Sequence, residues 1–322
     1  MATTTTIAIR RPTRALAVFA WIVVTYNILV ILWGAVVRAT GSGAGCGDRW
    51  PLCNGDFFPH HPRLATIIEF AHRSMTGICT VLVIALTVWT FYSSERGDRV
   101  RRAAIASVFF LITEALLGAV LVLGGYVEHN ISIARVVMQS IHFTNTMLLL
   151  GALGLTAWWL SWSGASEDAF TPPHNLKAPA WISLIATLLV GATGAVAALA
   201  DTLFPSPSLQ AALAADFAAT SPLLIRMRWI HPAAAVIGLC CVLWLVGKFR
   251  IRLSQTVAVL LCLQFVLGIM DILLLAPTWM QILHLLMADV YWIALVGLTS
   301  RILLPERVVK APAVTLLAQH HP

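Results

Sequence analysis

The sequence predicts an all-α membrane protein in which eight transmembrane helices form two tandem, pseudo-symmetric four-helix bundles, with both termini in the cytoplasm. Three observations predict this class: the composition, eight long apolar runs and an internal duplication. Hydrophobic residues make up 59% of the 322 residues and charged residues 11%, and the mean hydropathy is +0.85. Soluble domains are far less apolar, so the chain is expected in a bilayer.

Eight apolar stretches are long enough to cross a bilayer as helices, which takes about 20 residues. They are joined by short connections and run over residues 15–37, 64–92, 103–125, 137–161, 180–200, 229–247, 254–275 and 282–304. The first stretch follows Arg10, Arg11 and Arg14, as a secretory signal would. Its apolar run is longer than the roughly 7–15 residues of a signal-peptide core, so we predict a retained helix.

Lys and Arg residues are unevenly distributed between the two sides of the predicted membrane. One side carries Arg10, Arg11, Arg14, Arg96, Arg99, Arg101, Arg102, Lys177, Lys248, Arg250, Arg252, Arg301, Arg307 and Lys310, and the other carries half as many, namely Arg38, Arg49, Arg63, Arg73, Arg135, Arg226 and Arg228. Because cytoplasmic loops are enriched in Lys and Arg, we expect both termini in the cytoplasm. This bias and anionic lipid explain the net charge of +7, so no nucleic-acid partner is expected.

The two halves of the chain resemble each other in several places. WIVVTYNILVILWGAVVRAT at 21–40 resembles WISLIATLLVGATGAVAALA at 181–200, EALLG at 114–118 resembles QFVLG at 264–268, and Gln139-x-x-His142 recurs as Gln281-x-x-His284. Such repeats indicate a duplicated structural unit. We therefore predict an N-terminal bundle over residues 1–161, a cytoplasmic linker over 162–179 and a C-terminal bundle over 180–322.

Each even-numbered predicted helix carries a histidine one or two turns inside its outer end: His72, His142, His231 and His284. Metal-binding side chains are costly inside a membrane and usually mark functional sites. Two histidines per half, at equal depth on separate helices, are what axial ligation of one haem iron requires. The alternative is that some of them only form hydrogen bonds between helices. A di-iron carboxylate centre is excluded, because only Glu69-x-x-His72 has the required Glu-x-x-His spacing.

Glu69 is the acid whose position best fits catalysis. The i, i+3 spacing puts it on the same helix face as His72, about one turn nearer the outside. A carboxylate there can move protons or stabilise a cationic intermediate. The alternative is an ion pair with Arg73 or Arg63. Arg228 occupies the equivalent position of the second half, so the two predicted sites are chemically unequal.

Cys46 and Cys53 lie in the first outer loop, where an oxidising compartment favours a disulfide. A structural staple and a redox function both remain open for this pair. The remaining cysteines lie inside predicted helices, where packing is their expected role. Two outer arginines, Arg38 and Arg73, are candidates for binding haem propionates, because a guanidinium matches a carboxylate bidentately.

Together these residues resemble the haem A synthase family, and the resemblance covers essentially all eight predicted helices. It rests on GAVVRATGSG at 34–43, on the Cys46-x6-Cys53 spacing around Trp50-Pro51-Leu52, on Glu69-x-x-His72-Arg73, and on His142, His231 and His284. Some members of the family carry a second cysteine pair before the sixth helix, whereas residues 201–228 contain no cysteine. A mechanism that needs this second pair is therefore not expected here.

The resemblance implies an oxidoreductase acting on a CH group, which converts a methyl of haem O to the formyl of haem A by two successive hydroxylations. It implies a resident haem b, with its iron held by His231 and His284. Haem O would be the substrate between His72 and His142, with Glu69 essential. The expected location is the inner (cytoplasmic) membrane, with the active sites toward the outer face, in the service of cytochrome oxidase assembly. Expected partners are a haem O synthase, an electron acceptor and the lipid bilayer.

A di-haem b electron-transfer protein that exchanges electrons with quinol is the alternative from a different class, because four paired histidines fit both. The unequal halves, with Glu69 opposite Arg228, and the cysteine loop favour the enzyme. A transporter is less well supported, since the chain lacks the interrupted helices expected at a midplane substrate site. The oxygen source, the electron acceptor and assembly into a homo-oligomer stay open.

Overall fold

The computed structural model describes residues 13–161 and 174–304. Within these ranges the chain is helical, without a β-strand, and Cys53 and Asp56 form an isolated β-bridge. The helices are α1 (Arg14–Ala39), α2 (Leu64–Ser93), α3 (Arg99–Leu123), α4 (Ile133–Ser161), η1 (His174–Leu176), α5 (Lys177–Leu203), α6 (Leu209–Phe217), α7 (Leu223–Met227), α8 (Ile230–Lys248), α9 (Arg252–Leu273) and α10 (Thr278–Leu303). The all-α prediction is confirmed for these residues. Most of the predicted linker lies outside the described residues, as do Arg10, Arg11, Arg307 and Lys310.

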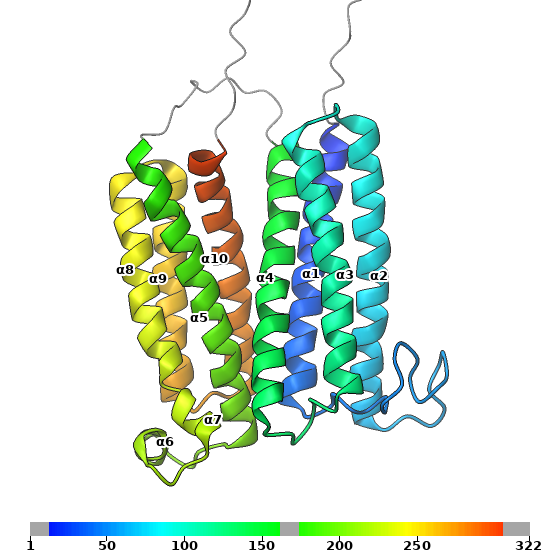
Figure 1. Ribbon diagram of the computed structural model, residues 1–322, viewed down its shortest axis with the longest axis vertical. Helices are drawn as coiled ribbons and strands as arrows, with labels where there is room; N and C mark the ends of the chain where they lie inside the picture. The colour runs from blue at the N-terminus through cyan, green and yellow to red at the C-terminus, as the bar shows by residue number, and fades with distance from the viewer. Residues whose placement is uncertain (1–12, 162–173, 305–322) are drawn as a thin grey trace, which may run out of the picture.

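The long helices run side by side along the long axis of the molecule (Figure 1). The helices α1 to α4 lie together on one side and α5, α8, α9 and α10 on the other, and α4 contacts both α5 and α10. We call these groups the N-terminal half and the C-terminal half. The end at which α1 begins and α10 ends is called the terminal end. The opposite end, which carries the loop 40–63 and the helices α6 and α7, is called the loop end.

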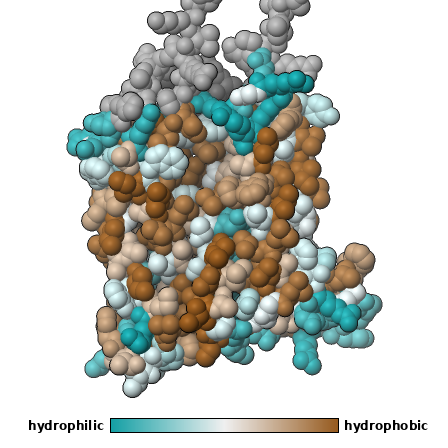
Figure 2. All heavy atoms as spheres, in the orientation of Figure 1, coloured by the Kyte–Doolittle hydropathy of each residue, from teal (hydrophilic) through white to brown (hydrophobic). Residues whose placement is uncertain are grey.

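Eight spans in the described residues are long and apolar enough to cross a membrane, and α7 and α8 together form one of them. Figure 2 shows a brown apolar band around the middle of the molecule, with teal polar residues gathered toward both ends. Large apolar side chains such as Val81 and Ile237 are exposed, as contact with lipid requires. The chain is a multi-pass membrane protein, and its described residues contain eight candidate membrane-spanning helices, as many as the sequence predicts.

Several helices begin earlier than their apolar runs predict, and in two of them a capping residue stabilises the added turn. The helix α3 begins at Arg99, where the sequence predicts residue 103, and the Asp98 carboxylate accepts a hydrogen bond from the Val100 N–H (3.1 Å). The helix α4 begins at Ile133, where the sequence predicts residue 137. The hydroxyl of Ser132 accepts a hydrogen bond from the backbone N–H of Arg135 (3.3 Å). Side-chain acceptors of this kind stabilise a first turn that hydropathy alone does not reveal.

The helices α4 and α10 connect the two halves through close packing of a small residue against an indole ring. Trp292 of α10 donates from Nε1 to the carbonyl oxygen of Met147 of α4 (2.7 Å). A Cβ added at Gly151 would lie 3.2 Å from the same Nε1, so glycine lets the ring approach without a crowded contact. Small residues allow membrane helices to approach this closely. The contact fixes the helix that carries His142 relative to the helix that carries His284.

The short helix α6 lies between α5 and α7, where the sequence predicts only a connection. Ser208 caps it by accepting a hydrogen bond from the Ala211 N–H (3.2 Å), and the residues that follow are mostly alanine and leucine, which favour helices. Arg228 fixes the segment, because its guanidinium pairs with Asp216 of α6 and with Asp201 of α5. With nine residues, α6 is too short to give a transmembrane signal in the sequence.

Candidate functional site

Each of the four predicted histidines lies toward the loop end and packs against a glycine of a neighbouring helix. These pairs are His72 of α2 with Gly34 of α1, His142 of α4 with Gly118 of α3, His231 of α8 with Gly194 of α5, and His284 of α10 with Gly268 of α9. A Cβ at these glycines would lie 3.0–3.6 Å from an imidazole atom. One arrangement therefore recurs four times, and at Gly34, Gly194 and Gly268 the missing side chain leaves room that the imidazole fills.

These glycines are site residues that sequence reasoning alone did not single out. The duplication could have pointed to these glycines, because it aligns Gly34 with Gly194 and Gly118 with Gly268. A glycine in an apolar helix is equally compatible with ordinary helix packing. The three-dimensional arrangement shows that the neighbour is a histidine in all four cases.

In the C-terminal half, His231 and His284 lie at a separation that suits one metal ion between them. Their ring centroids are 6.4 Å apart and the ring planes make an angle of 81°. Because metal–imidazole bonds are about 2.0–2.1 Å long, an iron between the two rings fits that separation. Nδ1 of His231 donates a hydrogen bond to the carbonyl oxygen of Val190 (3.1 Å). This bond leaves Nε2 as the nitrogen that can bind a metal.

Both halves contain an imidazole nitrogen that the protein leaves unsatisfied. Nδ1 of His72 and Nδ1 of His284 are buried and have no hydrogen-bond partner among the described residues. Gln264 of α9 lies beside the second of these rings, with its Nε2 3.2 Å from Nε2 of His284. Buried polar atoms without partners are rare in folded proteins. The two orphaned nitrogens are consistent with sites that a further group completes.

In the N-terminal half, His142 lies beside a second membrane acid, Glu114. Oε1 of Glu114 is 3.5 Å from Nε2 of His142, and the same carboxylate accepts hydrogen bonds from Asn145 and Thr146. Sequence reasoning does not assign Glu114 to the site. The duplication again contains the signal, because it aligns Glu114 with Gln264.

Glu69 is buried in α2, with 3% of its surface exposed, and both of its oxygens are bonded. Oε2 accepts a hydrogen bond from the backbone N–H of Cys46 (2.7 Å), and Oε1 accepts one from Nε of Arg73 (3.1 Å). The ion pair with Arg73, which the sequence offers as an alternative role, is therefore present. The pair also fixes the carboxylate one turn from His72, away from solvent.

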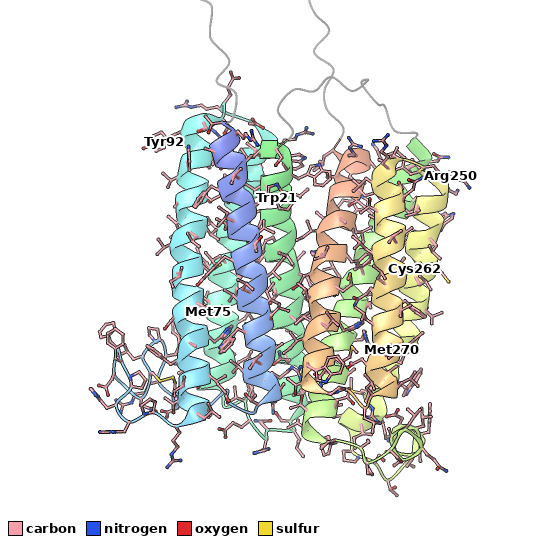
Figure 3. All side chains as sticks on the ribbon, turned by 180° about the vertical axis from the view of Figure 1, so that it is seen from behind. Trp21, Met75, Tyr92, Arg250, Cys262 and Met270 are labelled. Atoms are coloured by element: carbon pink, nitrogen blue, oxygen red, sulfur yellow. A yellow bond between two sulfur atoms is a disulfide. The ribbon has the colours of Figure 1, made fainter. Side chains whose placement is uncertain are left out.

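The loop that contains Cys46 and Cys53 is attached to α2 by the same two side chains. The predicted disulfide between these cysteines forms, and both are buried (Figure 3). Arg73 donates from Nη1 to the carbonyl oxygen of Leu52 (2.6 Å), while Glu69 accepts from the Cys46 N–H. The disulfide loop thus covers the carboxylate of Glu69.

We expect Cys46 and Cys53 to resist thiol labelling in the isolated protein until a reductant is added. The protein is unfolded in detergent before labelling, so that the free cysteines Cys79, Cys240, Cys241 and Cys262 become accessible and serve as internal controls. The double variant Cys46→Ser/Cys53→Ser then separates the two roles. Loss of activity with normal folding and haem content would identify a redox-active pair, whereas loss of folding would identify a staple. Labelling of both cysteines without reductant would show that the bond is absent in solution.

Arg38, a predicted propionate-binding residue, crosses from α1 to the C-terminal half. It donates to the carbonyl oxygen of Ala198 (2.6 Å), to the hydroxyl of Thr202 (2.5 Å) and to Oε1 of Gln281 (2.8 Å). Arg73 is likewise bonded within the protein. Propionate binding by either arginine stays a prediction, and it would require these bonds to be shared or exchanged.

The C-terminal half has a different side chain at the position equivalent to Glu69. Its counterpart Arg228 pairs with Asp201 (2.9 Å) and with Asp216 (2.8 Å). The predicted inequality of the two halves is therefore present in the structure. A buried carboxylate lies one turn from His72, whereas the equivalent position holds a guanidinium neutralised by two acids.

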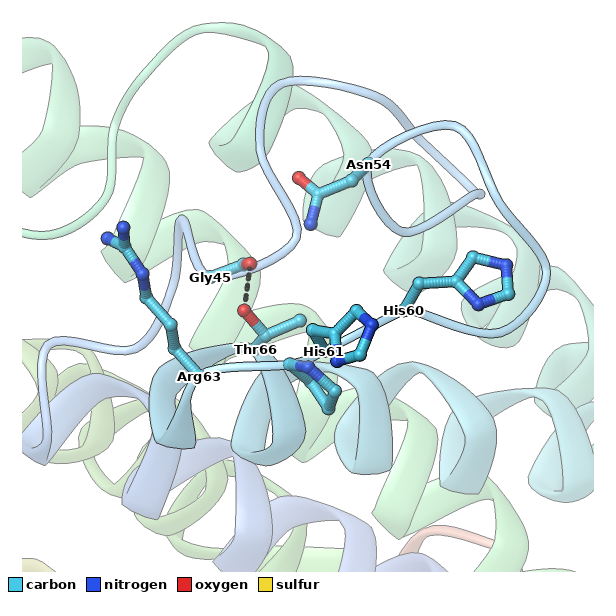
Figure 4. A pocket seen from close by; sticks show the side chains of 7 residues that line it. Gly45, Asn54, His60, His61, Arg63 and Thr66 are labelled. Carbon is cyan, nitrogen blue, oxygen red and sulfur yellow. Dashed lines mark hydrogen bonds between the residues drawn. The ribbon is translucent and has the colours of Figure 1, made fainter.

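A pocket lies at the loop end, next to the disulfide (Figure 4). It is lined by Gly45, Asn54, His60, His61, Pro62, Arg63 and Thr66. The Thr66 hydroxyl donates to the Gly45 carbonyl oxygen (2.7 Å), which ties the loop to the start of α2. In the described part of the chain, no three His, Cys, Asp or Glu residues gather as a metal-binding group. The two-histidine pairs are compatible with that finding, because a porphyrin supplies the other four ligands of its iron.

Residues 17–296 match the family model described as cytochrome oxidase assembly protein. A Thermus thermophilus protein named protoheme IX farnesyltransferase is 43% identical over 293 residues, which cover 88% of this chain and 48% of that protein. Heme A synthase of Bacillus pumilus is 33% identical over 214 residues (63% of this chain, 66% of the relative), and heme A synthase of Exiguobacterium sibiricum is 30% identical over 182 residues (56% and 59%). The chain spans about half to two thirds of the length of these relatives. Because the family model covers most of the chain and all four histidines, the chain belongs to the cytochrome oxidase assembly protein family.

Proposed function

We propose that this protein is a haem A synthase, an oxidoreductase that converts a methyl group of haem O to the formyl group of haem A by successive hydroxylations. The observation that carries the proposal is the presence of two unequal two-histidine sites. His231 and His284 lie at a separation that suits two ligands of one iron, whereas His72 lies one turn from the buried Glu69 and His142 lies beside the partly buried Glu114. Relatives named heme A synthase, 30% and 33% identical to the chain, support the assignment.

In this proposal, the helices form two tandem, pseudo-symmetric four-helix bundles, residues 1–161 and 180–322, joined by the linker 162–179. The recurring histidine–glycine contacts support a duplicated unit. We place the terminal end in the cytoplasm and the loop end at the outer face of the inner membrane. The excess of Lys and Arg near the terminal end supports this orientation.

In the C-terminal half, His231 and His284 would hold haem b. Bound there, haem b supplies an acceptor for the electrons that leave the substrate. The protein contributes orientation, because the carbonyl oxygen of Val190 holds Nδ1 of His231 and leaves Nε2 for the iron. Gly194 and Gly268 keep the space beside the two imidazoles free of side chains.

We expect Gly194→Ala to lower the haem b content of the purified protein severalfold. The added Cβ would lie 3.0 Å from Cε1 of His231 and displace the imidazole. Gly247→Ala is the matched control, since a Cβ at this glycine of α8 has nothing within 4 Å. The visible spectrum and the protein concentration give haem b per chain. Equal haem b content in the two variants would contradict the role given to Gly194.

The N-terminal half takes haem O between His72 and His142, with Glu69 as the catalytic carboxylate. Two donors, the Cys46 N–H and the Arg73 guanidinium, hold that carboxylate in one orientation. A fixed carboxylate can take up the proton released when a methyl C–H is oxidised, or stabilise positive charge at the reacting carbon. The disulfide loop keeps solvent away from it, which strengthens both effects.

A haem O synthase is the proposed source of the substrate, because farnesylation of protohaem produces haem O. The Thermus relative carries the name of a protoheme IX farnesyltransferase, and the match to this chain covers about half of the relative's length. This name supports a link between haem farnesylation and the present chain. An electron acceptor in the membrane is the second proposed partner, since oxidation of a methyl to a formyl removes four electrons and a single bound haem would pass on only one at a time.

Chromatography of extracted haems distinguishes this function from the di-haem electron carrier, which uses the same four histidines. Cells that make haem O but no haem A receive either the chain or an empty vector. We expect haem A only in cells that carry the chain. Persistence of haem O without haem A, in cells that accumulate the folded protein, would favour the electron-transfer alternative.

A further inference from the structure

Two adjacent phenylalanines, Phe57 and Phe58, lie exposed in the loop 40–63. Their exposed fractions are 82% and 75%, and Phe57 is the most exposed large apolar side chain among the described residues. In water, such a pair would leave two aromatic rings without a packing partner. A cluster of large apolar side chains on a surface marks a site of contact with another molecule or with a membrane. The pair therefore needs a partner from outside the chain.

The depth of Phe58 in the membrane follows from its contact with α2. Its ring packs against that of Phe70, with a centroid separation of 6.1 Å. Phe70 lies about 9 Å along the axis of α2 from Leu64, at which this helix begins. The helix has 30 residues and is about 45 Å long, whereas the hydrocarbon core of a bilayer is about 30 Å thick. A centred core would thus begin about 7–8 Å inside the helix, at the level of the Phe58 ring.

The loop folds back along α2 toward the apolar band of the molecule. Figure 1 shows it rising beside the end at which α2 begins. In Figure 2 its side toward the apolar band carries brown atoms, whereas teal atoms gather on the side that faces away. The exposed charged and polar residues of the loop include Asp48, Arg49, Asn54, Asp56, His60, His61 and Arg63. The loop is therefore amphipathic, as a segment that lies in a membrane interface has to be.

The lipid-facing surface of α2 continues directly into the aromatic pair. Leu64 and Ile67 are exposed, and together with Phe70 they follow one another at a spacing of three residues. This spacing places the three side chains on one face of the helix. Phe58 extends that face sideways through its contact with Phe70. Because lipid covers the exposed apolar face of a membrane-spanning helix, phospholipid is the partner that fits the pair.

Polar contacts attach the first part of the same loop to α2. The N–H of Cys46 donates to Glu69, and Arg73 donates to the carbonyl oxygen of Leu52. These contacts lie on one side of Cys53, with which Cys46 forms the disulfide. The two phenylalanines follow on the other side of Cys53. A second attachment at the phenylalanines would therefore hold both parts of the loop.

We propose that Phe57 and Phe58 insert between the lipid headgroups and acyl chains at the loop end and anchor the disulfide loop to the membrane. The anchor and the polar contacts together hold the loop over Glu69. The partner is the phospholipid bilayer itself and not another protein. The inference needs only a chain that spans a membrane, and it is independent of the haem chemistry proposed above.

Photo-crosslinking identifies what lies against the two rings. Phe57 or Phe58 is replaced by p-benzoylphenylalanine, and the purified full chain is placed in nanodiscs of phosphatidylcholine and phosphatidylglycerol. After near-ultraviolet irradiation, mass spectrometry of the intact chain should show the added mass of one phospholipid at both positions. His60→p-benzoylphenylalanine is the matched control, because His60 is an exposed polar residue of the same loop. We expect at least about tenfold less lipid adduct there, since apolar burial favours insertion of a phenylalanine by about that factor and a position facing water lacks this gain.

Equal yields of lipid adduct at positions 57, 58 and 60 would overturn the proposal, and so would the absence of lipid adducts at 57 and 58. The same three variants are also irradiated in membranes isolated from cells. An adduct with another protein in place of lipid would assign the pair to a protein interface, and this result would equally overturn a lipid anchor.

Removal of the anchor should expose the disulfide. In nanodiscs, we expect Phe57→Ser/Phe58→Ser to raise by about tenfold the rate at which a membrane-impermeant phosphine reduces the Cys46–Cys53 bond, because loss of the aromatic burial shifts the loop toward a detached state. His60→Ser/His61→Ser changes two polar neighbours in the same loop and should keep the wild-type rate. Equal rates of reduction in the two double variants would contradict the anchoring role. If the phenylalanine double variant does not accumulate, the lipid adducts decide the inference.

Discussion

Replacing Glu69 by glutamine should abolish haem A formation while haem b stays bound. Glutamine retains the size of the side chain and can still accept the hydrogen bond from the Cys46 N–H, but it cannot take up a proton. Because a positioned acid–base group contributes about 10²–10⁴-fold in rate, haem O or a hydroxylated intermediate should accumulate. Chromatography of extracted haems measures the product, and the visible spectrum measures haem b.

Glu95→Gln is the matched control for this experiment. Glu95 is an exposed acid at the terminal end, between α2 and α3, at the opposite end of the helices from both histidine pairs. Its substitution should leave haem A formation unchanged. A wild-type yield of haem A from Glu69→Gln would remove Glu69 from the mechanism and leave it as the partner of Arg73.

His231→Ala and His284→Ala should each remove most of the haem b from the purified protein. Each substitution deletes one of two axial ligands, which weakens iron binding and opens the site. His72→Ala and His142→Ala should retain haem b and lose haem O conversion, because these histidines belong to the other pair. The visible spectra of the four purified variants, together with their extracted haems, provide the comparison.

His129→Ala is the control for the four histidine variants, since His129 is exposed in the loop between α3 and α4. It should behave like the wild type in both measurements. Equal loss of haem b from all four site variants would show that the two pairs are alike. The di-haem electron-transfer protein would then be the better assignment.

The helices were predictable because a membrane leaves a spanning chain few other ways to satisfy its backbone hydrogen bonds. Helix ends were less predictable, since caps such as Asp98 and Ser132 add a turn that is not apolar. The helix α6 was missed because nine residues outside the bilayer carry no transmembrane signal. Local side-chain chemistry, which the hydropathy pattern averages out, determines both features.

The histidines and Glu69 were predictable because ionisable residues are rare inside a membrane and these recur at matched positions. The residues that contact the sites from other helices were not predictable. Arg38 bonds the carbonyl oxygen of Ala198, 160 positions away, and that contact depends on how the two halves pack. Glu114 was overlooked because its importance lies in a contact with His142, which no spacing within one helix reveals.

The haem composition of isolated membranes that contain the protein, followed over time after addition of haem O, tests the proposed reaction most directly. With the wild-type chain, haem O should decline and haem A should appear in matching amount, while haem b stays constant. Membranes that contain His72→Ala should show no change in haem O. Unchanged haem O in wild-type membranes whose haem b is intact and can be reduced and reoxidised would contradict a haem A synthase.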